Sequence, residues 1–277
     1  MHRPAQGMYG EWFEKPFLEA SASFYAADAA RALSECDVPS YLRHAEGRLA
    51  EEAERCGAYL DAPTQRPLLA AVERALVASH LQALLDKGFA PLMTEGRVTD
   101  LARLYALAGR VGAHDVLRTA LSSYVKATGK RLVTDADKDG EMVTQLLELK
   151  ARMDAVLRDA FAGSDSFANA LKDAFETFIN ERANRPAELV AKYIDSLLKA
   201  GNKGTSDEEL EALLDRVLIL FRYISGKDVF EAFYKKDLAK RLLLGACMLA
   251  ALHCMATHIV CSRQLQAKAP PSTRRRA

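Results

Sequence analysis

The densest cluster of potential metal ligands in this sequence is the segment 135–140, which reads Asp-Ala-Asp-Lys-Asp-Gly. Acidic residues at positions 1, 3 and 5 followed by glycine at position 6 match the first half of a calcium-binding loop. Such a loop also needs a bidentate glutamate at position 12, but that position is Leu146 and Glu148 comes two residues late. We therefore predict a polar turn whose carboxylates favour the start of the next helix, and no calcium site.

A second group with metal-ligating side chains lies near the C-terminus. Cys247, Cys254 and Cys261 are seven residues apart, with His253 and His258 among them. Seven-residue spacing places the thiols on one stripe of a helix, too far apart to share a tetrahedral zinc ion. Neither a CxxC pair nor an HxxxH pair occurs here. We therefore expect three small apolar residues of a helix rather than a metal or redox site.

Other reactive groupings are equally hard to assemble. The sequence suggests no nucleophile with a paired base, no phosphate-binding glycine loop and no pair of carboxylates in a pocket. We therefore expect no catalytic residue, no cofactor-binding residue and no metal ligand, and we do not expect an enzyme. The arginines at 274–276 follow a proline pair and read as a solvated basic end.

Composition indicates an ordinary soluble protein. Hydrophobic residues make up 49% and charged residues 27% of the 277 residues, a typical balance for domains with a real core. The net charge of +1 favours neither nucleic acid nor a membrane surface as a partner. The N-terminus lacks the apolar core of a signal peptide, and an odd number of scattered cysteines favours a reducing compartment. We expect a cytoplasmic or nuclear location, or both.

Nearly the whole chain is predicted to be helical, because apolar residues recur at spacings of three and four. No alternation typical of a strand is present. Glycines interpreted as helix ends include Gly88, Gly109, Gly129 and Gly201. Five helices are expected between 97 and 200.

Side chains on the facing stripes of these helices should be buried. Phe178 and Tyr193 lie on two such stripes and are predicted to pack between adjacent helices. Helix starts are predicted at Asp37, which is followed by a proline, and at Ser206, where Glu209 completes a capping box.

The segment 226–245 has the strongest pattern and reads as one amphipathic helix. Asp228 is a possible cap, and Gly245 is a plausible end. Acid-before-base pairs four residues apart are predicted for Glu231 with Lys235 and for Asp237 with Arg241. The expected apolar face comprises Phe230, Phe233, Tyr234, Leu238 and Leu242.

The same segment also resembles a known signature. The stretch 229–243, Val-Phe-Glu-Ala-Phe-Tyr-Lys-Lys-Asp-Leu-Ala-Lys-Arg-Leu-Leu, is similar to the start of the C-terminal half of cullins, closest to the fourth cullin type. Agreement in the same order is found in four other segments: 13–20 (Phe-Glu-Lys-Pro-Phe-Leu-Glu-Ala), 174–180 (Ala-Phe-Glu-Thr-Phe-Ile-Asn), 185–193 (Arg-Pro-Ala-Glu-Leu-Val-Ala-Lys-Tyr) and 200–203 (Ala-Gly-Asn-Lys). The resemblance covers about residues 8–245 and stops at Gly245.

This resemblance implies an all-α fold, an elongated stack of helical bundles that is like an α-solenoid. It divides the chain into four parts. Residues 1–90 resemble the latter part of a cullin repeat, and 91–205 resemble a complete five-helix repeat. Residues 206–245 resemble the start of the cullin four-helix bundle, and 246–277 form a divergent tail that we expect to be poorly ordered.

The resemblance also implies a function. Cullins are non-catalytic scaffolds of cullin-RING ubiquitin ligases, which act in ubiquitin-dependent protein catabolism and the ubiquitin-like conjugation pathway. The implied partners are ligase subunits: an adaptor or substrate receptor, and a RING protein. Compared with the family the chain looks truncated at both ends, so no adaptor-contact or RING-contact residue carries over to it. The alternative is a general α-helical solenoid interaction module unrelated to ubiquitin.

Overall fold

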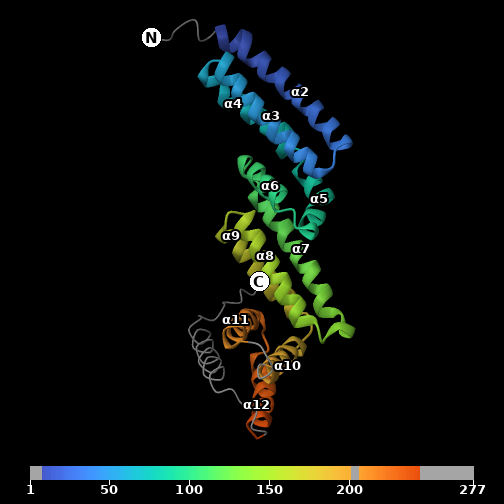
Figure 1. Ribbon diagram of the computed structural model, residues 1–277. Helices are drawn as coiled ribbons and strands as arrows, with labels where there is room; N and C mark the ends of the chain where they lie inside the picture. Colours follow the sequence, from blue (N-terminus) through green and yellow to red (C-terminus); the bar gives the residue numbers. More distant parts are fainter. Residues whose placement is uncertain (1–7, 201–205, 244–277) are drawn as a thin grey trace, which may run out of the picture. The chain divides into compact units, whose positions relative to one another are not determined.

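The computed structural model describes residues 8–200 and 206–243, and the regular elements in these ranges are all helices (Figure 1). The expected all-α fold class is therefore confirmed for the described residues. The α-helices are α2 (Lys15–Glu35), α3 (Val38–Tyr59), α4 (Ala62–Glu73), α5 (Leu81–Glu95), α6 (Val98–Arg110), α7 (His114–Thr134), α8 (Met142–Asp159), α9 (Asp165–Ile179), α10 (Arg185–Ala200), α11 (Asp207–Tyr223) and α12 (Lys227–Leu243). Three short helical segments of other types complete the series: η1 (Gly10–Glu14), η2 (Arg74–Ala78) and η3 (Ala136–Lys138).

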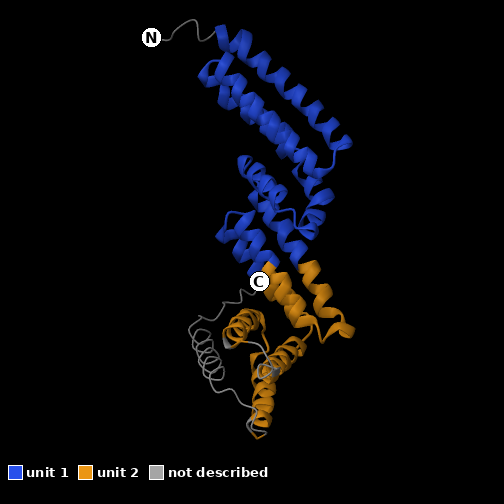
Figure 2. Ribbon diagram, viewed as in Figure 1, with its two compact units in different colours: residues 1–125, 152–173 blue, residues 126–151, 174–277 orange. Residues whose placement is uncertain are grey.

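The chain divides into two compact units, shown in different colours in Figure 2. Unit 1 comprises residues 1–125 and 152–173, and unit 2 comprises 126–151 and 174–277. These units are defined by contacts in space, whereas the repeat boundaries expected from the sequence rest on the family resemblance. The repeat boundaries therefore stay predictions. One of them, at residue 90, falls inside α5.

In unit 1, α2 and α3 are joined by buried polar contacts as well as by apolar packing. Asp28 of α2 is 4% exposed, and its carboxylate accepts hydrogen bonds from His44 at 2.7 Å and from Arg48 at 3.2 Å, both on α3. A buried carboxylate needs such partners, since an unpaired charge in the interior is costly. The predicted start of α3 is confirmed, because the Asp37 side chain accepts a hydrogen bond from the amide of Ser40 at 3.0 Å.

A second part of unit 1 is built around an aromatic cluster. Tyr105 of α6 stacks on His114 of α7 with ring centroids 4.3 Å apart, and Phe161 and Phe167 lie 5.6 and 5.5 Å from Tyr105. These rings join α6, the start of α7, the α8–α9 turn and the start of α9. Aromatic pairs at such separations stabilise a core beyond their buried area.

In unit 2, the prediction for Phe178 is confirmed, because this α9 side chain is 1% exposed. Its ring lies 4.9 Å from that of Phe175, and Phe175 in turn lies 5.5 Å from Tyr223 of α11. The prediction for Tyr193 is wrong, since this α10 side chain is only half-buried. Tyr193 borders the apolar stripe of α10, whereas Ile194 lies at its centre with 0% exposure.

Two of the glycines predicted as helix ends, Gly88 and Gly129, have another role, whereas the prediction that a helix ends at Gly109 is confirmed to within one residue. Gly88 and Gly129 lie inside α5 and α7, and Gly109 is the penultimate residue of α6. A Cβ atom added at these positions would meet Val38, Phe178 and His114 at 2.5, 2.4 and 2.9 Å, respectively. They are therefore points of close helix approach. Two other glycines lie where helices end, at Gly96 and Gly112, each with φ of +67°.

The helical run formed by α4 and η2 is interrupted at Ser79 and His80, after which α5 starts anew. Among the described residues no single helix has the length and apolarity to cross a membrane; the pair Ala62–Ala78 and Leu81–Glu95, bent by 50°, meets that test only jointly. Gly201 and the expected tail from 246 lie outside the described residues.

Candidate functional site

Within the segment that has the most specific sequence pattern, residues 227–243 form α12 in unit 2 (Figure 1). The helix begins at Lys227, so Asp228 lies in its first turn rather than at the capping position. There its carboxylate still favours the positive end of the helix dipole. Space is tight at Gly226, just before the helix, where an added Cβ atom would stand 3.2 Å from Oδ1 of Asn184.

The turn that leads into α12 is held by Asn180, the residue that follows α9. Its side-chain amide donates a hydrogen bond to the carbonyl of Tyr223 at 2.9 Å. Its side-chain carbonyl accepts hydrogen bonds from the amide and the hydroxyl of Ser225, both at 2.9 Å. One side chain thus satisfies backbone groups at the end of α11 that the helix itself leaves unpaired. The α11–α12 turn is therefore fixed to the end of α9.

Aromatic side chains join α11 to α12. The rings of Phe221 and Phe230 are 4.5 Å apart, and Tyr234 is stacked 5.8 Å from Phe230. Phe230 is 0% exposed and Tyr234 7% exposed, so this part of the expected apolar face is buried. Lys227 lies over the Phe221 ring at 5.7 Å, and burial lowers the pKa of its amine. The apolar face of α12 therefore begins as predicted.

A buried ion pair continues that face. The guanidinium of Arg241 is 2% exposed and donates a hydrogen bond to Asp195 on α10. Lys199, one turn further along α10, binds the other oxygen of the same carboxylate. The Arg241 guanidinium also lies 5.8 Å from the centre of the Tyr234 ring. Because both charges are removed from water, their attraction is strong and their geometry fixes α12 on α10.

This ion pair was missed by the sequence-based prediction, which paired Arg241 with Asp237. In the structure Asp237 binds Lys240 at 3.1 Å instead, whereas the predicted pair of Glu231 and Lys235 is confirmed at 2.7 Å. A signal did exist in the sequence. Arg241 falls in helical phase with Phe230 and Tyr234, so a charged residue interrupts an apolar stripe.

The acidic segment 135–140 has a structural role in unit 2. Asp135 precedes the short helix η3. The carboxylate of Asp139 accepts hydrogen bonds from Arg182 in the α9–α10 turn and from Arg185 at the start of α10. Arg182 also donates to the carbonyl of Val133 at 3.0 Å. The hydrogen bond from Arg182, followed by that from Arg185, lowers the pKa of Asp139. Two guanidinium groups therefore occupy the oxygens that a calcium ion would need.

Some of the remaining potential metal ligands lie within the described residues and others lie outside them. Within residues 8–200 and 206–243, no three His, Cys, Asp or Glu side chains are placed to hold a metal ion. Cys56 is buried, which raises the pKa of its thiol, and Cys36 is half-buried. The five candidate residues at Cys247, His253, Cys254, His258 and Cys261 lie outside the described residues, so the interpretation of that segment stays a prediction.

The region where α12 packs against α10 and α11, called here the α12 junction, has a structural role. The Asp195–Arg241 ion pair, the packing of Phe221 on Phe230 and the turn capped by Asn180 fix α12 against the two other helices. Such contacts hold helices in one relative position. A long series of helices like the one described here is typical of a helical scaffold or interaction protein.

Comparison with known proteins agrees with this class. The family model described as the cullin alpha solenoid domain matches residues 1–249. The chain is 51% identical to human Cullin-4A over 239 residues, 43% identical to Cullin-4 of Dictyostelium discoideum over 232, and 40% identical to Cullin-3A of Arabidopsis thaliana over 247. These alignments cover 86%, 84% and 87% of this chain. The chain belongs to the cullin family.

The same alignments cover 32%, 29% and 34% of the three relatives, so the chain spans about a third of the length of the curated relatives it matches. Both type-four relatives exceed the type-three relative in identity, which confirms the expected similarity to the fourth cullin type.

Proposed function

We propose that this chain is a segment of the non-catalytic scaffold of a cullin-RING ubiquitin ligase, acting in ubiquitin-dependent protein degradation. The observation that carries the proposal is the 51% identity with human Cullin-4A over 86% of the chain. The proposed setting is the cytoplasm, the nucleus or both.

The proposed role is mechanical. A cullin scaffold holds a substrate receptor at one end and a RING protein with its ubiquitin-charged partner at the other. Transfer of ubiquitin between two held reactants depends on their distance and orientation, so flexible joints between them lower its rate. The Asp195–Arg241 pair and the Asn180-bound turn support this role, because each removes a degree of freedom at the α12 junction. No residue of the chain takes part in bond making in this proposal.

The proposed partners are ubiquitin-ligase subunits, namely an adaptor or receptor and a RING protein, with neither nucleic acid nor membrane involved. We propose that their contact residues belong to parts of the scaffold other than this segment. A chimera of human Cullin-4A in which residues 8–245 of this chain replace the matching segment tests the assignment.

The chimera is expected to capture adaptor and RING protein in a single complex, as unaltered Cullin-4A does in a parallel pull-down. This chain alone is expected to capture neither. A folded chimera that binds the two subunits only in separate complexes would contradict the scaffold assignment. Capture of either subunit by the chain alone would contradict the placement of the contact residues.

A further inference from the structure

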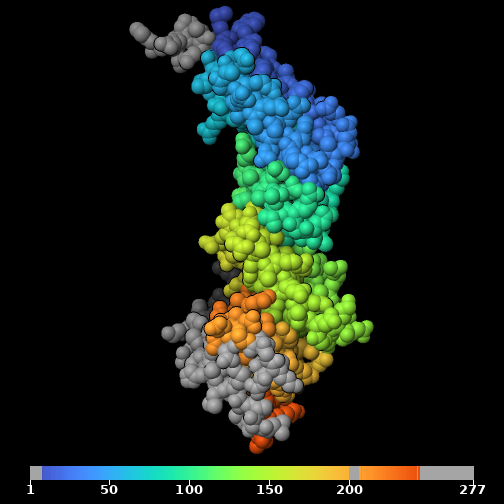
Figure 3. Space-filling view, viewed as in Figure 1, coloured from blue at the N-terminus to red at the C-terminus, as the bar shows by residue number. Residues whose placement is uncertain are grey.

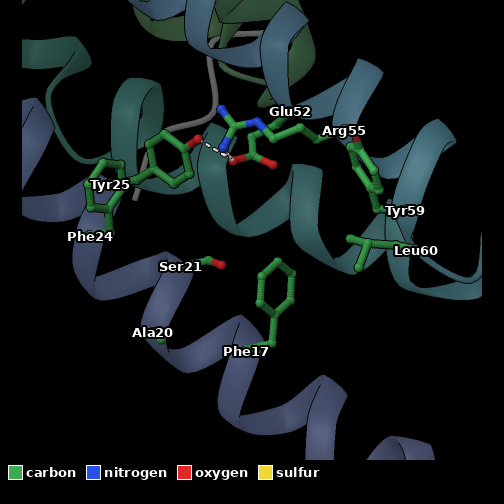
Figure 4. Close-up of a pocket in the computed structure, with 9 residues that line it drawn as sticks. All are labelled: Phe17, Ala20, Ser21, Phe24, Tyr25, Glu52, Arg55, Tyr59 and Leu60. Carbon is green, nitrogen blue, oxygen red and sulfur yellow. Dashed lines mark hydrogen bonds and ion pairs between the residues drawn. The ribbon is translucent and has the colours of Figure 1, made fainter.

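We draw no further inference here: the strongest candidate, the apolar groove of unit 1 that Phe17, Phe24 and Tyr59 line between α2 and α3 (Figure 4), belongs to the surface of these two helices at the blue and cyan end of the space-filling view (Figure 3), and nothing in the structure shows what covers it.

Discussion

Gly129 of α7 lies against the ring of Phe178 of α9 so closely that a Cβ atom at residue 129 would stand 2.4 Å from two ring carbons. The backbone of one helix thus contacts the side chain of the other without an intervening methyl group. Phe178 is 1% exposed and itself packs on Phe175, so the ring has no free space into which to move.

Gly129→Ala should therefore destabilise the protein, although alanine is the better helix former by roughly 1 kcal/mol. Gly47 provides the matched control, since it lies inside α3 with nothing within 4 Å of an added Cβ. Gly47→Ala should raise the free energy of unfolding by about 0.5–1 kcal/mol. Urea unfolding of both variants measures the contrast, and equal shifts of the same sign would show that the ring contact is absent.

Phe178→Ala should lower the free energy of unfolding by about 3–5 kcal/mol, because it removes a fully buried aromatic side chain and leaves a cavity. Tyr193→Ala should cost clearly less, since that ring is half-buried. Thermal unfolding followed by circular dichroism compares the two. A melting temperature unchanged by Phe178→Ala would contradict the packing of α9.

Removing the two partners of the Asp195–Arg241 pair should lower the free energy of unfolding by unequal amounts. Asp195→Ala leaves the buried Arg241 guanidinium unpaired and should cost about 3–5 kcal/mol. Arg241→Ala should cost less, because Lys199 still binds Asp195. The control Lys235→Ala breaks an exposed pair and should cost only about 0.3–0.5 kcal/mol. Chemical denaturation of the three variants measures these differences, and a loss no greater in Asp195→Ala than in Lys235→Ala would mean that the pair is solvated.

Asp139 should contribute to the acid sensitivity of the protein. Hydrogen bonds from Arg182 and Arg185 hold its pKa below the ordinary value of about 3.9. A depressed pKa gives stability that is present above the unfolded-state pKa and is lost as the pH falls through the folded-state pKa. Asp139→Asn should flatten the decline of stability below about pH 4. The exposed Asp137→Asn serves as control, and identical pH profiles for wild type and Asp139→Asn would contradict the expectation.

Calcium should not bind at 135–140. The Asp139 oxygens are occupied by two arginines, and Leu146, at the position that needs a bidentate carboxylate, is 0% exposed in the core. Calorimetric titration with calcium at millimolar concentration should give no binding heat. A saturable signal that Asp137→Ala removes would show that the loop does bind the ion.

The local parts of the fold were accessible from sequence because they depend on neighbours a few residues apart. The capping box of Ser206 and Glu209 and the capping side chain of Asp37 are examples. Glycines are harder to interpret from sequence, since glycine is favoured both where a helix ends and where two helices pack closely together. Only the facing side chain, Val38 for Gly88 and Phe178 for Gly129, distinguishes the two.

Only some contacts of the α12 junction could be predicted from the sequence, because the others join residues that are far apart in the chain. The aromatic face of α12 follows from helical spacing, but the partner of Arg241 lies 46 residues away on α10. Short-range rules assign a charged residue to its own helix, because a solvated pair four residues apart is the default. Burial of the pair depends on the tertiary packing of α10 against α12, which no local pattern encodes.

Substrate ubiquitination by the Cullin-4A chimera tests the proposed scaffold role most directly. Rates are compared for unaltered Cullin-4A, for the chimera with residues 8–245 of this chain, and for a control in which a flexible glycine–serine linker of equal residue number replaces the segment. The chimera should ubiquitinate a receptor-bound substrate at a rate close to that of Cullin-4A, and the linker control should be much slower. A folded chimera that binds both ligase subunits but is as slow as the linker control would contradict the account.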